Sequence, residues 1–257
     1  MNKNVLITGV SSGIGKQMVN LFRERGWQVL GVDRNESTDC DAFVTVDLCQ
    51  PDAAGTICDS FSNHLSGGLN AFISNAAMEH FQSVANTTVA QWNAVLAANL
   101  NAPFFLAQQL HAPLAKREGS IVNISSVHAT ATTSNIAAYA ASKGGMSAMT
   151  RAVALEFACD RIRVNSISPG AIDTPLLREG MARGDLGGRS IEDAIADLSA
   201  CTPLGRIGNP NEIAETAFFL ADNDKSGFIT GQDIVVDGGV LSALSSEVST
   251  VFRPGSR

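Results

Sequence analysis

The chain has 257 residues, of which 45% are hydrophobic and 17% are charged, and its formal net charge is −7. A chain of this length and apolar content can bury a sizeable core, and α/β folds of this size are commonly one domain, so we expect a single domain over residues 1–257. The acidic balance and the lack of a dense Lys/Arg run argue against nucleic acid or an anionic membrane as a partner.

The amino terminus, "MNKNVLITG", leads directly into an apolar run. The sequence has no signal-peptide pattern and no stretch of 18 apolar residues, so we expect a cytoplasmic protein. Its five cysteines are odd in number and lack CxxC spacing, which predicts reduced thiols and no metal site. They are Cys40, Cys49, Cys58, Cys159 and Cys201.

Short β-branched runs alternate along the chain with longer helical stretches such as 14–26 and 137–158. This rhythm predicts an α/β fold, a Rossmann-like doubly wound parallel sheet with helices on both faces. The strands are nearly continuous apolar runs, as expected when both faces of the sheet are covered. The predicted strands lie at 4–9, 28–33, 42–48, 71–77, 119–126, 161–170 and 232–239.

Two segments depart from this rhythm. Only 13 residues separate Asp33 from Asp47, which is too short for a full crossover helix. Residues 178–190, "REGMARGDLGGRS", are rich in Gly and Arg and predict a mobile loop. We expect this loop to belong to a mobile substrate lid around 174–206.

A glycine-rich turn, "TGVSSGIG" at 8–15, lies between the first strand and the first helix. Gly9, Gly13 and Gly15 allow a tight turn and a close backbone approach to a pyrophosphate, whose charge would meet the helix amino terminus. On the glycines alone a plain βα turn is the alternative, but the strand before, the helix after and an acidic residue on the next strand agree with a dinucleotide-binding pattern.

That acidic residue is Asp33, at the end of the second strand. A carboxylate there can accept hydrogen bonds from the adenosine ribose and would repel the 2′-phosphate of NADP, so NAD is favoured. Arg34 follows directly and partly offsets the repulsion. Asp47 and Leu48 end the third strand, where the adenine is expected, although Asp47 as a helix N-cap is an equal alternative.

The only tyrosine of the chain, Tyr139, stands four residues before Lys143 in "YAASK". The two share one helix face, and an ammonium beside the phenol, together with a nicotinamide cation, would lower the tyrosine pKa. Tyr139 then becomes a candidate general acid or base. The alternative is a surface tyrosine with an incidental lysine.

Two further polar residues support the chemical interpretation. Ser126 ends a strand at the carboxyl edge of the sheet, where its hydroxyl can polarise a substrate carbonyl. Asn99 lies in a mostly apolar helical segment and needs a partner. It is either an amide that caps the core or the holder of a water that links Lys143 to solvent.

Together these motifs resemble the short-chain dehydrogenase/reductase family, and they span nearly the whole chain. The matching pieces are TGxxxGIG at 8–15, "SNAA" at 74–77, Asn99, Ser126, Tyr139 with Lys143, "SPGAIDTP" at 168–175 and "ITGQDIVVDGG" at 229–239. Ser74 and Ala77 depart from the family's NNAG turn, which questions how closely Ala77 approaches the cofactor.

The resemblance implies a catalytic tetrad, in which Tyr139 transfers the proton and Lys143 holds the nicotinamide ribose, with Ser126 and Asn99 beside them. It also implies a homotetramer built through the helices that carry Asn99 and Tyr139. Besides the glycines, the acids and the tetrad, the implied cofactor contacts are Ser11, Ser12, Ile14, Asn75, Ala76, Ala77, Pro169, Gly170, Ile172 and Thr174.

Glu79 and His128 are candidate substrate-binding residues together with Ser126 and Tyr139. Their surroundings resemble those of bacterial glucose 1-dehydrogenases within the family, which implies hydrogen bonds to sugar hydroxyls. A solvated Glu79 and a structural His128 are equal alternatives. The resemblance to 3-hydroxybutyrate dehydrogenases is weaker, because that group has an amide in place of Glu79 and a lysine in place of Ile136. An anionic substrate is kept open by Arg178, Arg183 and Arg189.

The sequence therefore predicts an NAD-dependent oxidoreductase that transfers a hydride between the nicotinamide and a secondary alcohol or ketone, with a sugar or polyol as the first candidate. A 3-hydroxy acid dehydrogenase and an NADPH-dependent 3-oxoacyl reductase are alternatives with the same catalytic residues. A non-catalytic NAD-binding regulator is the alternative from another class.

Overall fold

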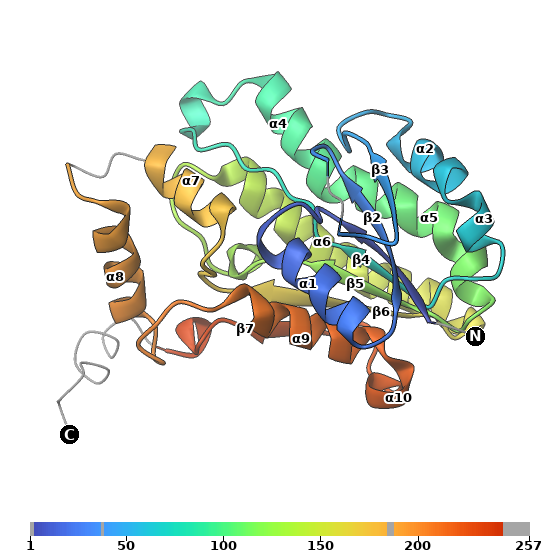
Figure 1. Cartoon of the computed structure of the whole chain (residues 1–257). Helices are drawn as coiled ribbons and strands as arrows, with labels where there is room; N and C mark the ends of the chain where they lie inside the picture. Colours follow the sequence, from blue (N-terminus) through green and yellow to red (C-terminus); the bar gives the residue numbers. More distant parts are fainter. Residues whose placement is uncertain (1–2, 37–38, 184–187, 244–257) are drawn as a thin grey trace.

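The computed structural model describes residues 3–36, 39–183 and 188–243. Its centre is a seven-stranded parallel sheet with the order β3-β2-β1-β4-β5-β6-β7 (Figure 1), which confirms the predicted doubly wound fold. The strands are β1 (Asn4–Thr8), β2 (Gln28–Asp33), β3 (Ala42–Thr45), β4 (Ala71–Ser74), β5 (Ser120–Ile124), β6 (Arg163–Pro169) and β7 (Asp233–Val236).

Helices cover both faces of the sheet, because alternate residues of each strand point to opposite sides and are apolar on both. On one face, α1 (Gly13–Glu24) and α9 (Pro210–Ala221) pack together over Val5 and Ile7 of β1. On the other face lie α2, α5 and α6 (Figure 1). Leu6 of the same strand belongs to a core cluster shared with these helices. These three helices are α2 (Ala53–Ser60), α5 (Ala102–Ala115) and α6 (Ala137–Phe157).

The shorter elements lie in the connections. They are α3 (Ser62–Leu65), α4 (Val89–Leu96), α7 (Pro175–Arg183), α8 (Ile191–Cys201), α10 (Asn223–Ser226), the 3-10 turns η1 (Val84–Asn86), η3 (Val127–Ala129), η4 (Ala158–Asp160) and η5 (Val240–Ser242), and the π-helical turn η2 (Ala97–Asn101). Within the described ranges, no helix is long and apolar enough to cross a membrane.

The two irregular segments have different outcomes. Between β2 and β3, residues 34–36 and 39–41 contain no helix, which agrees with the expected short crossover. The prediction of a loop at 178–190 is wrong for residues 178–183, because α7 continues to Arg183. Residues such as Leu, Arg, Glu and Met favour a helix and outweigh the single glycine there, and a Glu179–Arg183 ion pair of 2.9 Å adds support. Residues 184–187 of that prediction lie outside the described ranges, and the mobility of the lid stays a prediction.

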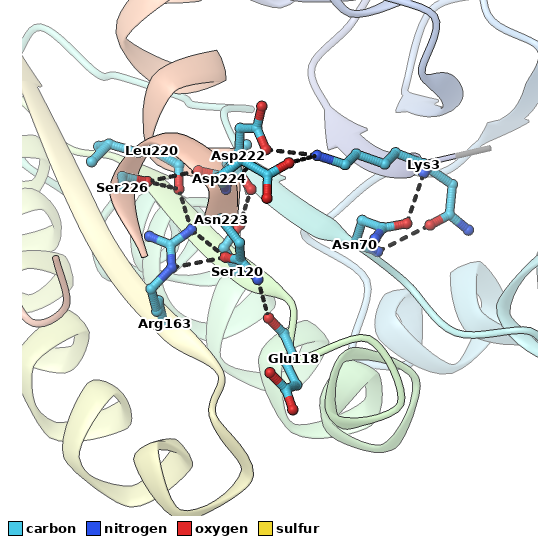
Figure 2. A network of polar contacts seen from close by, with 12 residues as sticks. Lys3, Asn70, Glu118, Ser120, Arg163, Leu220, Asp222, Asn223, Asp224 and Ser226 are labelled. Carbon is cyan, nitrogen blue, oxygen red and sulfur yellow. Dashed lines mark hydrogen bonds and ion pairs between the residues drawn. The ribbon is translucent and has the colours of Figure 1, made fainter. Parts of the chain in front are cut away.

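A polar network joins the amino edge of the sheet to the end of α9 (Figure 2). The buried Arg163 of β6 donates from Nη2 to the Leu220 carbonyl oxygen at 2.8 Å and from Nε to Asn223 Oδ1 at 2.9 Å. Next to it, Lys3 pairs with Asp222 at 2.7 Å. The bond from Arg163 to Leu220 satisfies one of the carbonyl groups that the end of α9 leaves without a helical partner. The network lies at the edge opposite to the strand ends considered next.

Candidate active site

The carboxyl ends of the central strands bring a serine, a tyrosine and a lysine together. Ser126 lies two residues beyond the end of β5 and is the N-cap of η3, where its Oγ accepts a hydrogen bond from the His128 amide at 3.2 Å. Tyr139 and Lys143 come from the first turns of α6, one helical turn apart on the same face. All three side chains are buried, so the structure places them in a region that water hardly reaches.

The Tyr139 hydroxyl is held in this buried region with Ser126 beside it. Burial is the main cause that raises the pKa of Tyr139 to about 12, and the charge of Glu79 acts in the same direction. Hydrogen bonding with the Ser126 side chain acts in the opposite direction and lowers the pKa. The predicted neighbourhood of Ser126 and Tyr139 is therefore present, and the phenol of the chain alone is firmly protonated at neutral pH.

The Lys143 ammonium group is buried beside the Tyr139 ring, and this burial changes its charge. Its Nζ lies 5.5 Å from the centre of the Tyr139 ring and donates to the Ile124 carbonyl oxygen at 2.7 Å. Burial lowers the pKa of Lys143 to about 7. In the chain alone, burial disfavours the charged form of both groups, and the lowering of the tyrosine pKa by the lysine together with a nicotinamide cation stays a prediction.

Asn99 lies in the π-helical turn η2 between α4 and α5, and its side chain is fully buried. The amide accepts from the Met78 backbone nitrogen at 2.8 Å and donates to the Met78 oxygen at 2.8 Å. It also donates to Ser142 Oγ on α6 at 3.0 Å. These bonds support the core-capping alternative for the side chain, while the water relay stays a prediction. Single-turn π insertions of this kind are frequent at functional sites.

The glycine-rich turn is closely packed against the loop after β4. Gly9 has a φ of +75°, which favours glycine, and a Cβ at Gly15 would lie 1.8 Å from the Gly9 carbonyl oxygen. Asn75 donates from Nδ2 to the Gly9 oxygen at 2.9 Å. Thr8, which the sequence interpretation missed, accepts from the Asn75 and Ala76 amides at 3.1 Å through its Oγ1. Its position at the last residue of β1 was the available signal.

The first helix begins at this turn with its amino end at the strand edge. Ser12 is the N-cap of α1 and makes no side-chain capping hydrogen bond within the described chain. The first-turn amides, including those near Gly13 and Ile14, therefore point to the place that the dinucleotide pattern assigns to phosphates. This observation fits the predicted phosphate-binding role of the turn.

Asp33 is fixed at the end of β2 by the same turn. Its Oδ2 accepts from the Ser11 amide at 2.9 Å and from Ser11 Oγ at 2.8 Å, and its Oδ1 accepts from the Asn35 amide at 3.0 Å. Arg34 beside it is exposed. The carboxylate is thus oriented at the glycine-rich turn before any ligand binds, as a ribose-binding role requires.

Asp47 and Leu48 follow β3 at the neighbouring position. Asp47 is exposed and accepts from the Cys49 amide at 2.9 Å, while Leu48 is half-buried. The N-cap of α2 is Asp52, so the alternative of Asp47 as a helix N-cap is wrong. The Asp47 carboxylate instead stabilises a turn, because it accepts a hydrogen bond from the backbone amide two residues further along the chain.

The segment after β6 reaches the glycine-rich turn from the other side. A Cβ at Gly13 would lie 3.3 Å from Thr174 Cγ2, so the two segments are in contact. Ile172 is buried, and Gly170 lies so close to Asp237 that a Cβ there would be 2.8 Å from the Asp237 Cα. Together with Pro169 at the end of β6, the structure brings the implied cofactor contacts to one edge of the sheet.

The two candidate substrate residues are close to Tyr139. The His128 ring lies edge-on to the tyrosine ring, with 5.9 Å between centroids, and burial lowers its pKa. Burial raises the pKa of the half-buried Glu79, and the nearby Arg183 opposes this rise. A Cβ at Gly180 of α7 would lie 2.5 Å from Glu79 Oε1, so this helix covers the carboxylate.

The three arginines of the predicted lid pair with carboxylates near the surface. Arg178 bonds Asp173 at 2.7 Å, and Arg189 bonds Asp197 at 2.6 Å. Arg183 pairs with Glu179, as described above. Exposed pairs of this type are mostly solvated, so these residues give little support to an anionic substrate.

A parallel sheet of this order, a glycine-rich turn at a helix amino end and a buried Ser126, Tyr139 and Lys143 group define a dinucleotide-binding oxidoreductase class. The comparison with known families agrees. Residues 9–241 match the family model described as "Enoyl-(Acyl carrier protein) reductase". The chain belongs to the short-chain dehydrogenase/reductase family.

Relatives match over nearly the whole chain. An uncharacterized oxidoreductase of Thermotoga maritima is 33% identical, with 93% of this chain and 95% of the relative covered. The cyclohexanol dehydrogenase of Acinetobacter sp. is also 33% identical, with 94% of this chain and 96% of the relative covered. The chain is accordingly an NAD(P)-dependent dehydrogenase/reductase that acts on CH-OH groups.

Solved structures match equally well. The aldohexose dehydrogenase of Thermoplasma acidophilum has a TM-score of 0.88 at 30% identity, with 95% of both chains covered. A 4-hydroxyisoleucine dehydrogenase complexed with NADH has a TM-score of 0.84 at 29% identity, with 95% of this chain and 100% of that chain covered. ElxO with NADP bound has a TM-score of 0.83 at 27% identity and the same coverage. Similar proteins thus bind NADH or NADP.

Proposed function

We propose that the chain is an NAD-dependent dehydrogenase whose substrate is a secondary alcohol or ketone rich in hydroxyl groups, such as a sugar or polyol. The observation that carries this proposal is the surroundings of the Tyr139 hydroxyl. Ser126 is its hydrogen-bonding neighbour, His128 stands edge-on to its ring, and the Glu79 carboxylate is close enough to raise its pKa. A proton-transferring phenol is thus combined with two side chains that can bond further hydroxyls.

The residues at the strand edge fit a dinucleotide. The first-turn amides of α1 suit the pyrophosphate, Asp33 suits the adenosine ribose, and Lys143 suits the nicotinamide ribose. A bound nicotinamide supplies hydride acceptance or donation at its C4. The fixed Asp33 carboxylate supports NAD over NADP through repulsion of a 2′-phosphate, and it opposes an NADPH-dependent 3-oxoacyl reductase.

The chain's own residues then manage the proton and the substrate oxygen. In alcohol oxidation, Tyr139 would first release its own proton, for which the near-neutral Lys143 is a neighbouring acceptor. The Tyr139 phenolate would then take the proton of the substrate hydroxyl that Ser126 Oγ orients, and the hydride would leave the carbon that carries this hydroxyl for a bound NAD. In ketone reduction, Tyr139 Oη returns a proton to the oxygen that Ser126 polarises. Lys143, with a pKa near neutral, can take up or release a proton beside the tyrosine at working pH.

The polar surroundings favour hydroxyls over a carboxylate on the substrate. Glu79 would repel an acid, and Ile136, at the position of the lysine in hydroxybutyrate enzymes, is buried and carries no charge. The similarity to an aldohexose dehydrogenase supports a sugar, whereas the similarity to a cyclohexanol dehydrogenase keeps a simple cyclic alcohol as the second candidate.

A homotetramer through α5 and α6 is part of the proposal. Phe104 and Phe105 on α5 are 43% and 46% exposed, and Leu155 on α6 is 81% exposed. Large apolar side chains grouped on neighbouring helices are typical of subunit interfaces. Sedimentation or light scattering measures the assembly directly. A cytoplasmic location stays a prediction of the sequence.

The test is NADH formation with a panel of aldoses, polyols, cyclohexanol and 3-hydroxybutyrate, combined with Tyr139→Phe. We expect turnover with at least one hydroxyl-rich substrate and its loss by about 10²-fold or more in Tyr139→Phe, with NAD affinity retained in calorimetry. Ser126→Ala should lower kcat with the same preference among substrates. Full turnover in Tyr139→Phe contradicts the mechanism, and silence across the panel with tight NAD binding favours the non-catalytic regulator.

A further inference from the structure

The face of α6 that carries the tyrosine and the lysine continues to a third polar residue. Tyr139, Lys143 and Ser147 are spaced four residues apart, so they form one stripe along the helix. Ser147 is 7% exposed and lies against the sheet. The proposed mechanism gives it no role, although a hydroxyl at this position of a packed helix needs a hydrogen-bonding partner.

The partner of Ser147 is Asp233, the first residue of β7. Ser147 Oγ donates to Asp233 Oδ2 at 2.9 Å, and Ser168 Oγ of β6 donates to Asp233 Oδ1 at 2.9 Å. Ser147 Oγ also lies 3.1 Å from Ser125 Oγ, at the end of β5. The Asp233 carboxylate thus connects β7 with α6 and β6, and Ser147 brings Ser125, the residue that follows β5, next to this link.

This connection ends at the catalytic neighbourhood. Ser125 is adjacent in sequence to Ser126, and its single hydroxyl proton has two acceptors on α6, the backbone oxygen of Lys143 at 3.2 Å and Ser147 Oγ at 3.1 Å. A shift of α6 along the sheet would therefore break hydrogen bonds on both sides of the Ser126 and Tyr139 pair. Apolar side chains in this layer would tolerate such a shift more easily, because dispersion contacts have no fixed direction.

We propose that Asp233 is a positioning residue that fixes the register of α6 on the sheet, and with it the placement of Tyr139 against Ser126. The carboxylate acts through Ser147 and Ser125 and does not contact the reacting atoms. This inference rests on the proposed dehydrogenase function for its kinetic consequence, whereas its structural consequence can be measured without turnover.

The experiment compares Asp233→Ala with Asn165→Ala as a matched control. Asn165 is fully buried on β6, where it donates to the Ile229 oxygen at 2.8 Å and accepts from the Gln232 amide at 3.0 Å. Both partners lie in the segment that leads into β7, and neither bond reaches α6. Both variants lose buried hydrogen bonds and should lose stability. Only the loss of the Asp233 hydrogen bonds is expected to change the placement of Tyr139 in the active site.

The first readout is NMR of the protein carrying tyrosine labelled with ¹³C at Cζ. Tyr139 is the only tyrosine, so the spectrum contains one protein resonance that reports on its hydroxyl. We expect this resonance to move or broaden in Asp233→Ala and to stay in place in Asn165→Ala. Asp233→Asn keeps one acceptor oxygen and is expected to restore part of the wild-type position.

The second readout is kinetic. We expect Asp233→Ala to lower kcat by about tenfold to a hundredfold, with the KM for NAD within about twofold, because misplacement of a reacting group mainly affects the chemical step. Should Asp233→Ala fail to fold, Ser147→Ala removes the same link from the helix side and leaves the Ser168 bond intact.

The outcomes separate this inference from the proposed function. Silence of the wild-type enzyme across the substrate panel contradicts the function, and the NMR comparison still decides the coupling. An unchanged tyrosine resonance in both Asp233→Ala and Ser147→Ala overturns the positioning role. Equal displacement in Asp233→Ala and Asn165→Ala also overturns it, because the effect would then be a general loss of packing.

Discussion

Lys143 and Tyr139 lie one turn apart on α6, with the lysine nitrogen 5.5 Å from the centre of the tyrosine ring. Burial moves the pKa values of these two groups in opposite directions, to about 7 for the lysine and to about 12 for the tyrosine. Both shifts have the same cause, since a low-dielectric environment favours the neutral form of each group.

The lysine shift predicts a pH dependence of stability. Between about pH 7 and 10.5 the unfolded chain binds the Lys143 proton and the folded chain does not, so the folded state becomes more stable as pH rises through this window. Below about pH 7 both states bind the proton, and the contribution of this group to stability no longer changes with pH. In Lys143→Met this contribution is absent, and the gain in unfolding free energy over wild type should be larger at pH 6 than at pH 10. Urea unfolding of the NAD-free wild type and variant at several pH values measures this difference in unfolding free energy. A difference that stays the same at every pH contradicts the lowered pKa of Lys143.

The position of the Asp33 carboxylate, which accepts hydrogen bonds from Ser11, predicts a preference for NAD over NADP. In Asp33→Asn the like-charge repulsion of a 2′-phosphate is removed, so the ratio of NAD to NADP affinity should fall by about tenfold or more. Calorimetric titration with both cofactors measures the ratio. Asp52→Asn, which removes an equal charge at the exposed N-cap of α2, is the control and should leave the ratio unchanged. An unchanged ratio in Asp33→Asn would show that another group sets the preference.

The contact between Gly180 and Glu79 predicts an effect on substrate binding. Alanine at 180 favours the α7 helix by about 1 kcal/mol, but its Cβ would meet Glu79 Oε1 and displace the carboxylate. We expect Gly180→Ala to raise the KM for a hydroxyl-rich substrate by about tenfold, which corresponds to ~1.4 kcal/mol, and to affect cyclohexanol little.

The control for this variant is Gly55→Ala in α2, where a new Cβ would meet only Gln109 Nε2 at 3.9 Å. It should increase stability without any change in KM. If Gly180→Ala binds both kinds of substrate as the wild type does, Glu79 has no part in hydroxyl recognition.

The network of Figure 2 predicts a loss of stability that does not reach the active site. Arg163→Leu leaves the Leu220 carbonyl oxygen and Asn223 without their buried donor, and we expect unfolding free energy to fall by about 3 kcal/mol. The KM for NAD should stay unchanged, because the network lies at the opposite edge of the sheet. Chemical denaturation and steady-state kinetics measure the two quantities.

Arg161→Ala serves as the comparison for this arginine. Arg161 pairs with Glu118 at 2.9 Å, and both side chains are largely exposed, so its removal should change stability by less than about 1 kcal/mol. A similar cost for the buried and the exposed arginine would show that burial of the Arg163 bonds contributes little.

Local patterns were sufficient for much of this protein. The apolar runs predicted all seven strands, and the spacing of Asp33 and Asp47 predicted a connection without a crossover helix. The shared face of Tyr139 and Lys143 follows from the helical repeat alone, and the glycine-rich turn follows from residues adjacent in sequence. The family resemblance, which the comparisons confirm, also depends on short motifs and their order.

Other properties depended on contacts between distant segments. Helix formation at 178–183 went against a glycine and arginine composition, and the covering of Glu79 by α7 depends on how that helix packs. The partners of Asn99 and Ser147 come from separate parts of the chain. The directions of the Lys143 and Tyr139 pKa shifts also depended on the segments that bury these two side chains. Helical and strand periodicity is set by near neighbours, whereas burial is set by everything that packs around a group, and burial controls the charge that the group can carry.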